Sequence, residues 1–300
     1  MRILAAIVTY NRMALLERCI DGIRAQVRPP DDIVVINNSS PDGTAQMLER
    51  KGVHYITQPN LGSAGGWRRS IEEALAGGWD AVWLMDDDGY PHPDALRLLE
   101  GELKPDVSCV SSVVLVEDDP NRFVFPFPRL GRNGLPVLVA ARRKVARLDE
   151  LKSLAGGRTY PFAHLFNGAL VSTDVVRRIG NVDSDFFLMG DEVDFFMRMR
   201  REGAVLSHLD AHHLHPDVGG RPLDAAKFYY YVKNTIILNG RYFDRVWTRN
   251  AMAVTAALAR TARRNSLGTA LSYVAGPRAP VLWKAVSRGL KGRIGKDFDA

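Results

Sequence analysis

The sequence predicts an α/β protein with a mostly parallel sheet and flanking helices, on three observations. Short apolar runs alternate along the chain with stretches whose apolar residues recur at helical spacing. The first run, residues 3–8, lacks polar alternation, which is typical of a strand buried on both faces of a parallel sheet. Another run, residues 81–85, ends in three consecutive aspartates, and open α/β sheets bind ligands at the carboxyl ends of their strands.

The elements follow in order. We expect strands over residues 3–8, 33–36, 53–57, 81–85, 107–116 and 204–208, and regular structure over 162–171. We expect helices over 13–26 and 43–50, from a glycine-rich loop to about 76, from about 93, over 174–179 and 191–202, and around 228–234. Residues 117–158 are rich in loop signals and include the basic stretch Arg142-Arg143-Lys144, so we interpret them as an irregular or hairpin insertion. The last ~55 residues predict two amphipathic helices with a break around 266–276.

Length and composition limit the protein class. With 300 residues, 46% of them hydrophobic, the chain can build one large domain, or one domain with an appendage. No apolar run reaches the ~18 residues that a membrane-spanning helix needs, and the N-terminus enters a strand without the layout of a signal peptide. Cys19 and Cys109 lie in apolar surroundings and are expected to be buried thiols, as suits a reducing cytoplasm.

The net charge of +6 is concentrated at the C-terminal end. From Arg241 onward there are 12 Lys or Arg and 3 acids, a net of +9, so the first 240 residues carry 28 basic and 31 acidic groups, a net of −3. A basic tail points to a polyanionic surface, either nucleic acid or anionic lipid. No nucleic-acid motif accompanies this tail, and its helices have aliphatic faces with tryptophans, which favours the membrane surface.

Asp86, Asp87 and Asp88 are the first candidate site. Adjacent carboxylates at a sheet edge repel one another unless a cation is bound, and hard oxygen ligands suit Mg²⁺ or Mn²⁺. Alternate side chains of an extended backbone point the same way, so we expect Asp86 and Asp88 to converge on one metal ion while Asp87 turns aside or takes a second role. The alternative is an acidic turn that caps the helix starting near residue 93.

Polar residues also follow the first two strands. They are Thr9, Tyr10, Arg12 and Asn37. Their amides and hydroxyls can hydrogen-bond a nucleobase and a sugar, although such residues are common in turns anyway. The loop from Asn60 to Gly66 has three glycines before a helix whose first turn carries Arg68 and Arg69, an arrangement that suits a phosphate.

A second acidic cluster, Asp191-Glu192, stands at a helix start. The helix dipole favours carboxylates there, which is a sufficient structural reason for them. The functional alternative is a general base, because a carboxylate in a water-poor site acquires the raised pKa that proton removal needs.

Histidines concentrate at His212, His213 and His215, next to Asp217. One of them is a candidate ligand for the ion held by the aspartates. A Zn²⁺ site built from this cluster is an alternative, although no companion cysteine spacing accompanies it.

These motifs occur together and in one order, and as a set they resemble the family 2 inverting glycosyltransferases of the GT-A type over residues 3–240. The motifs are Val8-Thr9-Tyr10-Asn11-Arg12, Asn37-Asn38-Ser39, Asn60-Leu61-Gly62, Ala64-Gly65-Gly66, the aspartate triplet, Phe166-Asn167-Gly168-Ala169, Gly190-Asp191-Glu192-Val193-Asp194 and His215. The triplet and the segments 122–126, 165–170 and 214–216 are most similar to bacterial galactofuranosyltransferases, which build galactan or related cell-surface glycans on a polyprenyl-diphosphate lipid.

Two alternatives to this branch stay open. Bacterial rhamnosyltransferases, which use dTDP-rhamnose, share nearly the same skeleton. A non-catalytic sugar-nucleotide-binding or scaffold protein belongs to another class. It would keep the glycine loop, but it could lack the base or the metal ligands that this chain retains.

The resemblance implies a GT-A fold and a metal-dependent, inverting transfer from UDP-galactofuranose. The residues it assigns to the nucleotide-sugar are Thr9, Tyr10, Arg12, Asn37, Asn60, Gly62, Gly65, Arg68, Asp86 and Asp87. It assigns Asp88 and His215, with Asp86, to the Mn²⁺ or Mg²⁺ ion. Glu192 falls at the position of the base, with Asp191 beside it on the acceptor side. The family commonly has Asp at the positions of Asn37 and Glu192, so either Glu192 or Asp191 remains a candidate base.

We expect residues 1–240 to form the catalytic domain, with a nucleotide-sugar half (1–115) and an acceptor half (116–240). Residues 241–300 are then a basic helical segment at the inner face of the cell membrane, which brings the enzyme to a polyprenyl-diphosphate-linked glycan acceptor. The apolar side chains expected to face the membrane are Val246, Trp247, Met252, Val254, Leu258, Leu271, Tyr273, Val281, Leu282, Trp283, Val286 and Leu290. The alternative is that these faces pack on the catalytic domain or on a second subunit of a homo-oligomer.

Overall fold

The structure is a computed structural model that describes residues 1–138, 144–218 and 222–297. The chain divides into two compact units, one of Met1–Val182 with Phe195–Asp217 and one of Asp183–Asp194 with Val218–Ala300. We call them the sheet unit and the helical unit. Arg142 and Arg143 of the predicted basic stretch lie outside the described residues.

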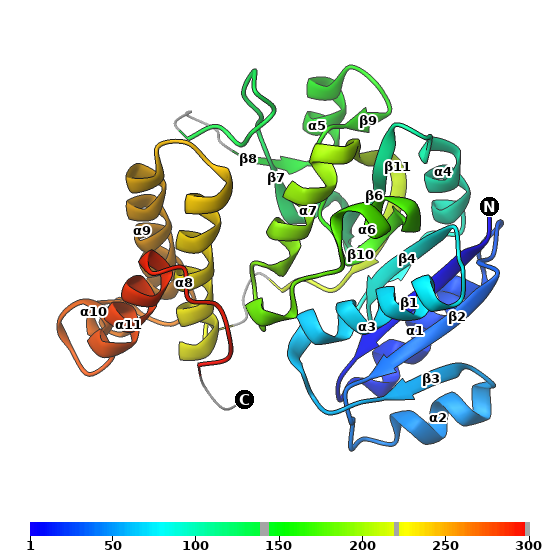
Figure 1. Ribbon diagram of the computed structural model, residues 1–300, viewed down its shortest axis with the longest axis horizontal. Helices are drawn as coiled ribbons and strands as arrows, with labels where there is room; N and C mark the ends of the chain where they lie inside the picture. Colours follow the sequence, from blue (N-terminus) through cyan, green and yellow to red (C-terminus); the bar gives the residue numbers. More distant parts are fainter. Residues whose placement is uncertain (139–143, 219–221, 298–300) are drawn as a thin grey trace. The chain divides into compact units, whose positions relative to one another are not determined.

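The sheet unit is organised around a mixed sheet (Figure 1). Its strands are, in spatial order, β3 (His54–Thr57), β2 (Asp32–Asn37), β1 (Ile3–Thr9), β4 (Ala81–Asp86), β10 (Asn167–Ser172), β6 (Val107–Val116), β11 (Ala204–His215) and β5 (Tyr90–Pro91). The strands β1 to β4 pair in parallel, as does β11 with β6, whereas β10 runs antiparallel to both of its neighbours. The predicted α/β class with a mostly parallel sheet is therefore confirmed.

Helices cover the sheet. Within the sheet unit they are α1 (Met13–Arg24), α2 (Thr44–Lys51), α3 (Gly62–Ala76), α4 (Ala95–Glu102), α5 (Leu148–Ala155) and α6 (Thr173–Ile179). The helix α7 (Asp191–Glu202) has its first turn in the helical unit and its remainder in the sheet unit.

The two faces of β1 pack against different helices. Every second residue of the strand joins one apolar cluster, in which Ile3, Ala5 and Ile7 of β1 meet Leu16, Ile20 and Ile23 of α1 and Leu96 and Leu99 of α4. The intervening residue Val8 lies against α3, where a Cβ atom on Gly66 would collide with its side chain. Gly66 therefore allows α3 to approach β1 closely, and this packing is a structural reason for one glycine of the loop.

The insertion forms a hairpin with added structure. The strand β7 (Asp119–Pro128) pairs antiparallel with β6 and with β8 (Lys144–Arg147), and the short β9 (Thr159–Tyr160) pairs with β11. Phe123 and Phe127 of β7, Val145 of β8 and Leu151 of α5 share an apolar cluster. The hairpin interpretation of residues 117–158 thus holds in the part of that stretch the structure describes.

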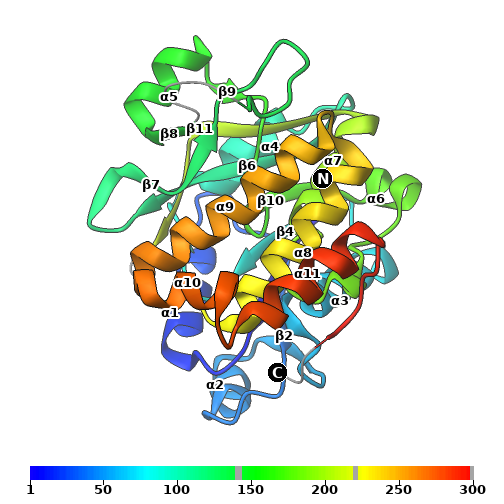
Figure 2. The same cartoon turned by 90° about the vertical axis from the view of Figure 1, so that its left-hand side faces the viewer.

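The helical unit contains a 3₁₀ turn (Ser184–Phe186) and the helices α8 (Ala225–Tyr242), α9 (Val246–Arg264), α10 (Leu267–Ala275) and α11 (Ala279–Leu290), which Figure 2 shows face on. The predicted break at 266–276 is wrong, because most of it is the helix α10. Ser266 caps this helix by accepting a hydrogen bond from the Thr269 amide at 3.0 Å, and Gly276-Pro277 ends it. The small residues that suggested a break are thus helix caps.

The core of the helical unit is built on α8, which packs against α9 and α11. Phe228, Tyr229 and Tyr230 of α8 share this core with Tyr273 and Leu282, two residues predicted to face a membrane. Val254, Leu258, Val281 and Val286 pack against it as well. All six of these side chains were predicted to face a membrane. In the structure they pack within the helical unit instead. The helical unit therefore includes α8 together with the C-terminal helices.

Among the residues that the structure describes, no helix combines the length and the apolar character needed to cross a bilayer.

Candidate active site

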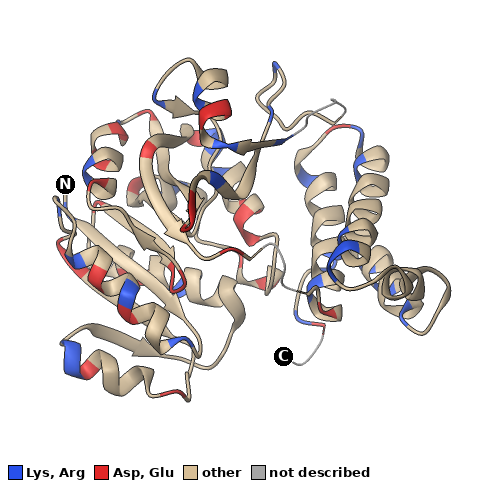
Figure 3. Cartoon of the chain, turned by 180° about the vertical axis from the view of Figure 1, so that it is seen from behind, with Lys and Arg blue, Asp and Glu red and all other residues tan. Residues whose placement is uncertain are grey.

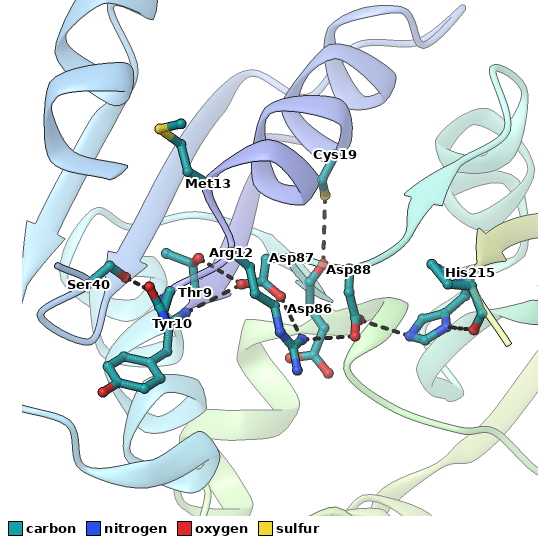
Figure 4. A network of polar contacts seen from close by, with 12 residues as sticks. Thr9, Tyr10, Arg12, Met13, Cys19, Ser40, Asp86, Asp87, Asp88 and His215 are labelled. Atoms are coloured by element: carbon teal, nitrogen blue, oxygen red, sulfur yellow. Dashed lines mark hydrogen bonds and ion pairs between the residues drawn. The ribbon is translucent and has the colours of Figure 1, made fainter. Parts of the chain in front are cut away.

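Asp87 is the centre of a polar network at the carboxyl ends of β1 and β4, shown in Figure 4. Its Oδ2 accepts hydrogen bonds from the Thr9 hydroxyl at 2.7 Å and from the Tyr10 amide at 3.3 Å, and its Oδ1 accepts one from Arg12 at 3.0 Å. Burial raises the pKa of Asp87, while Arg12 and the Thr9 hydroxyl act in the opposite direction. The second role expected for this residue is therefore to anchor the segment that follows β1.

Arg12 links the first strand to two aspartates. The same NH1 group that contacts Asp87 lies 2.8 Å from Oδ2 of Asp88. The guanidinium side chain is 41% exposed, whereas both carboxylates are almost fully buried. The Arg12 guanidinium therefore partly neutralises the two carboxylates. Its exposed face remains available to solvent or to an anionic ligand.

Asp88 also pairs with His215, the last residue of β11. Nε2 of His215 lies 2.8 Å from Oδ1 of Asp88, and Nδ1 of the same ring lies 2.6 Å from the carbonyl oxygen of Pro216. A carbonyl oxygen only accepts, so Nδ1 carries a proton. In the neutral ring Nε2 then directs a lone pair at a carboxylate oxygen, and the two repel unless a cation or a second proton lies between them.

The donor chemistry of Asp88 and His215 thus fits a divalent cation, with the outer hydrogen bond to Pro216 fixing the ring as it does in metal-binding histidines. In the described ranges, no group of three or more His, Cys, Asp or Glu side chains is arranged to hold a metal ion. A metal ion bound by this pair would take further ligands from substrate oxygens or water, as Mg²⁺ commonly does.

The expected convergence of Asp86 and Asp88 on one metal ion stays a prediction. The strand β4 ends at Asp86, and Asp87 and Asp88 lie in a turn, so the alternation of an extended backbone does not continue through them. Hydrogen bonds fix the backbone of Asp86. Its amide donates to the Phe166 carbonyl at 2.7 Å, and its carbonyl oxygen accepts from the Cys19 thiol. The thiols of Cys19 and Cys109 are both free and buried.

Asn37 and Asn60 hold turns. Asn37 is buried, and its Oδ1 accepts a hydrogen bond from the Ser40 amide at 2.9 Å. Asn60 does the same for the amide of Gly62 at 3.0 Å, where α3 begins. Both are side-chain hydrogen bonds that stabilise turns, which is the structural alternative to a role in nucleotide binding.

Gly65 and Arg68 of α3 have structural partners in or next to the same helix. A Cβ atom on Gly65 would collide with Leu61, and Arg68 forms an exposed ion pair with Glu72 at 2.9 Å. Exposed pairs of this kind are weak, so a ligand phosphate can compete for Arg68.

The other histidines do not join the pair. His212 and His213 alternate along β11, so their side chains leave opposite faces of the strand. His212 hydrogen-bonds the Leu209 carbonyl at 3.3 Å, and Asp217 pairs with Arg122 at 2.8 Å. His213 is fully buried against Gly89, and burial lowers its pKa to about 3. The alternative of a Zn²⁺ cluster finds no such grouping in the described part of the chain.

Asp191 and Glu192 form the first turn of α7, in the helical unit. Asp191 is buried, and burial followed by the charge of Glu192 raises its pKa to about 7. Glu192 is partly exposed. A carboxyl group with a pKa near neutrality is typical of acid–base sites, so both residues remain candidates.

Sequence reasoning missed a buried polar residue that contacts the segment before α7. Asn234 of α8 donates to backbone carbonyls of that segment. The available signal was the pair Lys233-Asn234 between the apolar residues of α8, because polar side chains in such a position need buried partners.

Comparison with known proteins gives the family. Glycosyl transferase family 2 matches residues 5–166. Galactofuranosyltransferase GlfT1 of Mycobacterium tuberculosis is 37% identical over 226 residues, covering 71% of this chain and 70% of that protein. The protein of the same name from Mycolicibacterium smegmatis is 35% identical over 219 residues, with the same coverage of 71% and 70%. An undecaprenyl-phosphate mannosyltransferase of Micrococcus luteus is 34% identical over 111 residues, 33% of this chain and 44% of that protein.

Solved structures share the fold at low identity. Mannosyltransferase PcManGT from Pyrobaculum calidifontis, in complex with GDP-Man and Mn²⁺, is 16% identical with a TM-score of 0.54, covering 96% of this chain and 85% of its own. GalNAc-T7 with UDP, GalNAc and Mn²⁺ is 13% identical with a TM-score of 0.62, covering 92% and 58%. Fold, family match and relatives agree: the chain belongs to glycosyl transferase family 2, and it is a glycosyltransferase with the GT-A-like fold that its motifs predict.

Proposed function

We propose that this glycosyltransferase transfers galactofuranose from UDP-galactofuranose to a lipid-linked glycan acceptor, with inversion at the anomeric carbon. The observation that carries the proposal is the identity of 35% and 37% to two galactofuranosyltransferases over 71% of the chain. It also fits the retention of the carboxylates and the histidine that such a transfer needs, at Asp88, Glu192 and His215.

In this proposal Asp88 and His215 hold a Mn²⁺ or Mg²⁺ ion. Two proteins of similar fold were solved with Mn²⁺, and the Asp88–His215 pair has the donor chemistry for a cation. When bound, the ion supplies positive charge that stabilises the departing diphosphate.

In this proposal the donor nucleotide binds next to the polar network around Asp87. The residues proposed to line it are Thr9, Tyr10, Arg12, Asn37, Asn60, Gly62, Gly65, Arg68, Asp86 and Asp87. The exposed face of Arg12 is suited to an anionic group, and the amino end of α3, which has no side-chain cap at Leu61, contributes a favourable dipole. These contacts hold the diphosphate in position.

Glu192 is the proposed base. It removes the proton from an acceptor hydroxyl, the hydroxyl oxygen forms a bond to the anomeric carbon, and the bond from that carbon to the diphosphate oxygen breaks. A single displacement of this kind inverts the configuration and releases UDP. Asp191 is the second candidate, because burial brings its pKa to about 7, near the value that favours proton transfer.

The acceptor in this proposal is a polyprenyl-linked glycan, and the helical unit lies on an anionic membrane surface, at the cytoplasmic face. Support for the lipid comes from the name of the undecaprenyl-phosphate mannosyltransferase relative. Figure 3 shows Lys and Arg distributed over the C-terminal helices. The exposed large apolar side chains of these helices are Trp247, Leu267, Leu271, Val274, Trp283 and Leu290. Basic helices with such side chains lie in the plane of lipid headgroups.

The proposal is tested by incubating the protein with Mn²⁺, a synthetic polyprenyl-diphosphate glycan and a panel of UDP- and dTDP-sugars, followed by mass spectrometry of the lipid product. Extension with UDP-galactofuranose alone is the expected result. Turnover of dTDP-rhamnose without turnover of UDP-galactofuranose would support the rhamnosyltransferase alternative and overturn the proposed donor. Binding of a sugar nucleotide without turnover of any donor would favour a non-catalytic protein.

A further inference from the structure

Asn234 is a buried polar residue on α8, 1% exposed, that the proposed reaction does not use. Its side-chain Nδ2 group carries two N–H donors and lies within hydrogen-bond distance of three backbone carbonyl oxygens. The acceptors are the carbonyl oxygens of Phe186 at 3.1 Å, Leu188 at 3.0 Å and Met189 at 2.5 Å. This segment leads directly into Asp191 and Glu192 at the start of α7.

The segment held by Asn234 has an unusual backbone. Phe187 and Met189 both have φ of 60°, and Gly190 has φ of 112°. Residues other than glycine rarely adopt positive φ, and they keep it only where the surroundings impose it. A Cβ atom on Gly190 would lie 2.9 Å from Cβ of Asn234, so the backbone passes directly against this side chain.

The other end of the acidic turn is held by the same helix. Asp194 is buried, and its Oδ1 accepts hydrogen bonds from the Tyr242 hydroxyl at 2.6 Å and from Arg241 at 3.2 Å. Positions 234, 241 and 242 are seven and eight residues apart, so they lie on one face of α8. This face therefore contacts the chain on both sides of Asp191 and Glu192.

We infer that Asn234 is a positioning residue for Glu192. By fixing the carbonyls of Phe186, Leu188 and Met189, it sets the direction in which the first turn of α7 presents its carboxylates. The inference rests on the proposed function, in which Glu192 removes the proton from the acceptor hydroxyl. Asn234 itself touches no reacting atom.

The chain offers a matched control on the same helix. Asn239 is also buried, and its Nδ2 donates to Oδ1 of Asn250 at 2.9 Å. Asn239→Ala thus removes a buried asparagine hydrogen bond from α8 without touching the segment before α7. Comparing it with Asn234→Ala separates a general loss of stability from a specific loss of alignment.

We expect Asn234→Ala to lower kcat by roughly 10- to 100-fold, because small misplacements of a catalytic group have effects of this size. The dissociation constant for UDP, measured by calorimetry, should stay at the wild-type value, as should kcat of Asn239→Ala. Asn234→Ser, a milder change that keeps one donor, is measured in parallel and replaces the alanine variant if that variant does not fold. Equal kcat values for the Asn234 and Asn239 variants would overturn the inference.

A double-mutant cycle tests whether Asn234 acts through Glu192. The variant with both Asn234→Ala and Glu192→Gln should have the same kcat as Glu192→Gln alone, because alignment of a group that cannot accept a proton has no further effect. Independent, multiplicative losses would overturn the positioning role while leaving Glu192 as the base. Full activity of Glu192→Gln would instead reject the proposed base, and the inference with it.

Discussion

Nε2 of His215 lies 2.8 Å from Oδ1 of Asp88, and the two side chains are 4% and 6% exposed. Both atoms are acceptors in the neutral ring, because Nδ1 is committed to the Pro216 carbonyl. Close contact of two buried acceptors is unfavourable without a positive charge between them. A bound divalent cation or a second proton on the ring supplies that charge.

The first prediction follows from this pair. His215→Ala should raise the Mn²⁺ concentration for half-maximal transfer by roughly 100-fold or more. Loss of a residue that only hydrogen-bonds a metal ligand already weakens metal binding by roughly 10- to 100-fold. Asp88→Ala should abolish transfer, because the diphosphate charge is left uncompensated. Activity is measured against Mn²⁺ concentration after chelator treatment. His212→Ala, on the opposite face of β11, is the control. Full activity of the chelated wild-type protein would contradict the metal assignment.

The second prediction concerns the anchor formed by Asp87. Thr9→Val removes the hydroxyl that donates to Asp87 at 2.7 Å and leaves a buried carboxylate oxygen short of a partner. We expect the free energy of unfolding to fall by roughly 1–3 kcal/mol. Urea denaturation measures this change, and Thr9→Ser, which retains the hydroxyl, is the matched control. Equal losses in both variants would contradict the role given to the hydrogen bond, because Thr9→Ser keeps the hydroxyl whereas Thr9→Val removes it and keeps the shape of the side chain.

The third prediction is a pH dependence of stability at Asp191. Because its pKa is raised to about 7 in the folded protein, the folded state keeps this proton where the unfolded chain has lost it. The stabilisation is complete below the unfolded pKa of about 3.9 and is lost as the pH rises to about 7. Relative to Asp191→Asn, the wild type should lose up to roughly 4 kcal/mol across this window.

Urea unfolding at about pH 5 and about pH 8 measures the difference between wild type and Asp191→Asn. The comparison with the variant cancels the titration of all other groups. Asp174→Asn, an exposed carboxylate in the first turn of α6, serves as the control and should show no such trend. A constant difference between wild type and Asp191→Asn would mean that Asp191 is ionised in the folded protein at both pH values.

The fourth prediction concerns the membrane surface. Leu267, Leu271 and Val274 are exposed at helical spacing along α10, a helix without charged residues. Leu271→Ser and Trp283→Ser should each reduce flotation with anionic liposomes, and high salt should reduce it further, because each nearby Lys or Arg contributes up to ~1 kcal/mol of screened attraction. Leu154→Ser, an exposed leucine of α5, is the control. Flotation that neither substitution changes would contradict this surface.

The first half of the fold was predictable because local signals and tertiary structure agree there. The strands β1, β2 and β4 are continuous apolar runs, and the apolar residues of α1 recur at helical spacing. The strand β11 was expected only over 204–208, since the histidines and aspartate that follow suggest a loop. Pairing with β6, past an irregularity after His208, extends it to His215. Tertiary pairing overrode local composition.

The candidate site was predictable in its chemistry more than in its geometry. The triplet and His215 were identified from the motif set, but the turn at Asp87 and Asp88 depends on how the chain leaves β4. No pattern of spacing indicates that Asp87 binds Thr9 and Arg12, because these partners come from another strand end. Asn234 was missed for the same reason, since its partners are backbone carbonyls far away in sequence.

The position of His215 at the end of β11 has a consequence for synthesis of the protein. Residue 215 follows residue 88 by 127 positions, and β11 joins the sheet by pairing with β6, β5 and β9. At about 5–20 residues per second, translation places the histidine roughly 6–25 s after the aspartates. During that interval the nascent chain carries the aspartate triplet without its imidazole partner. The pair therefore forms only after nearly the whole sheet unit has left the ribosome, so a truncated chain cannot bind a cation there through both residues.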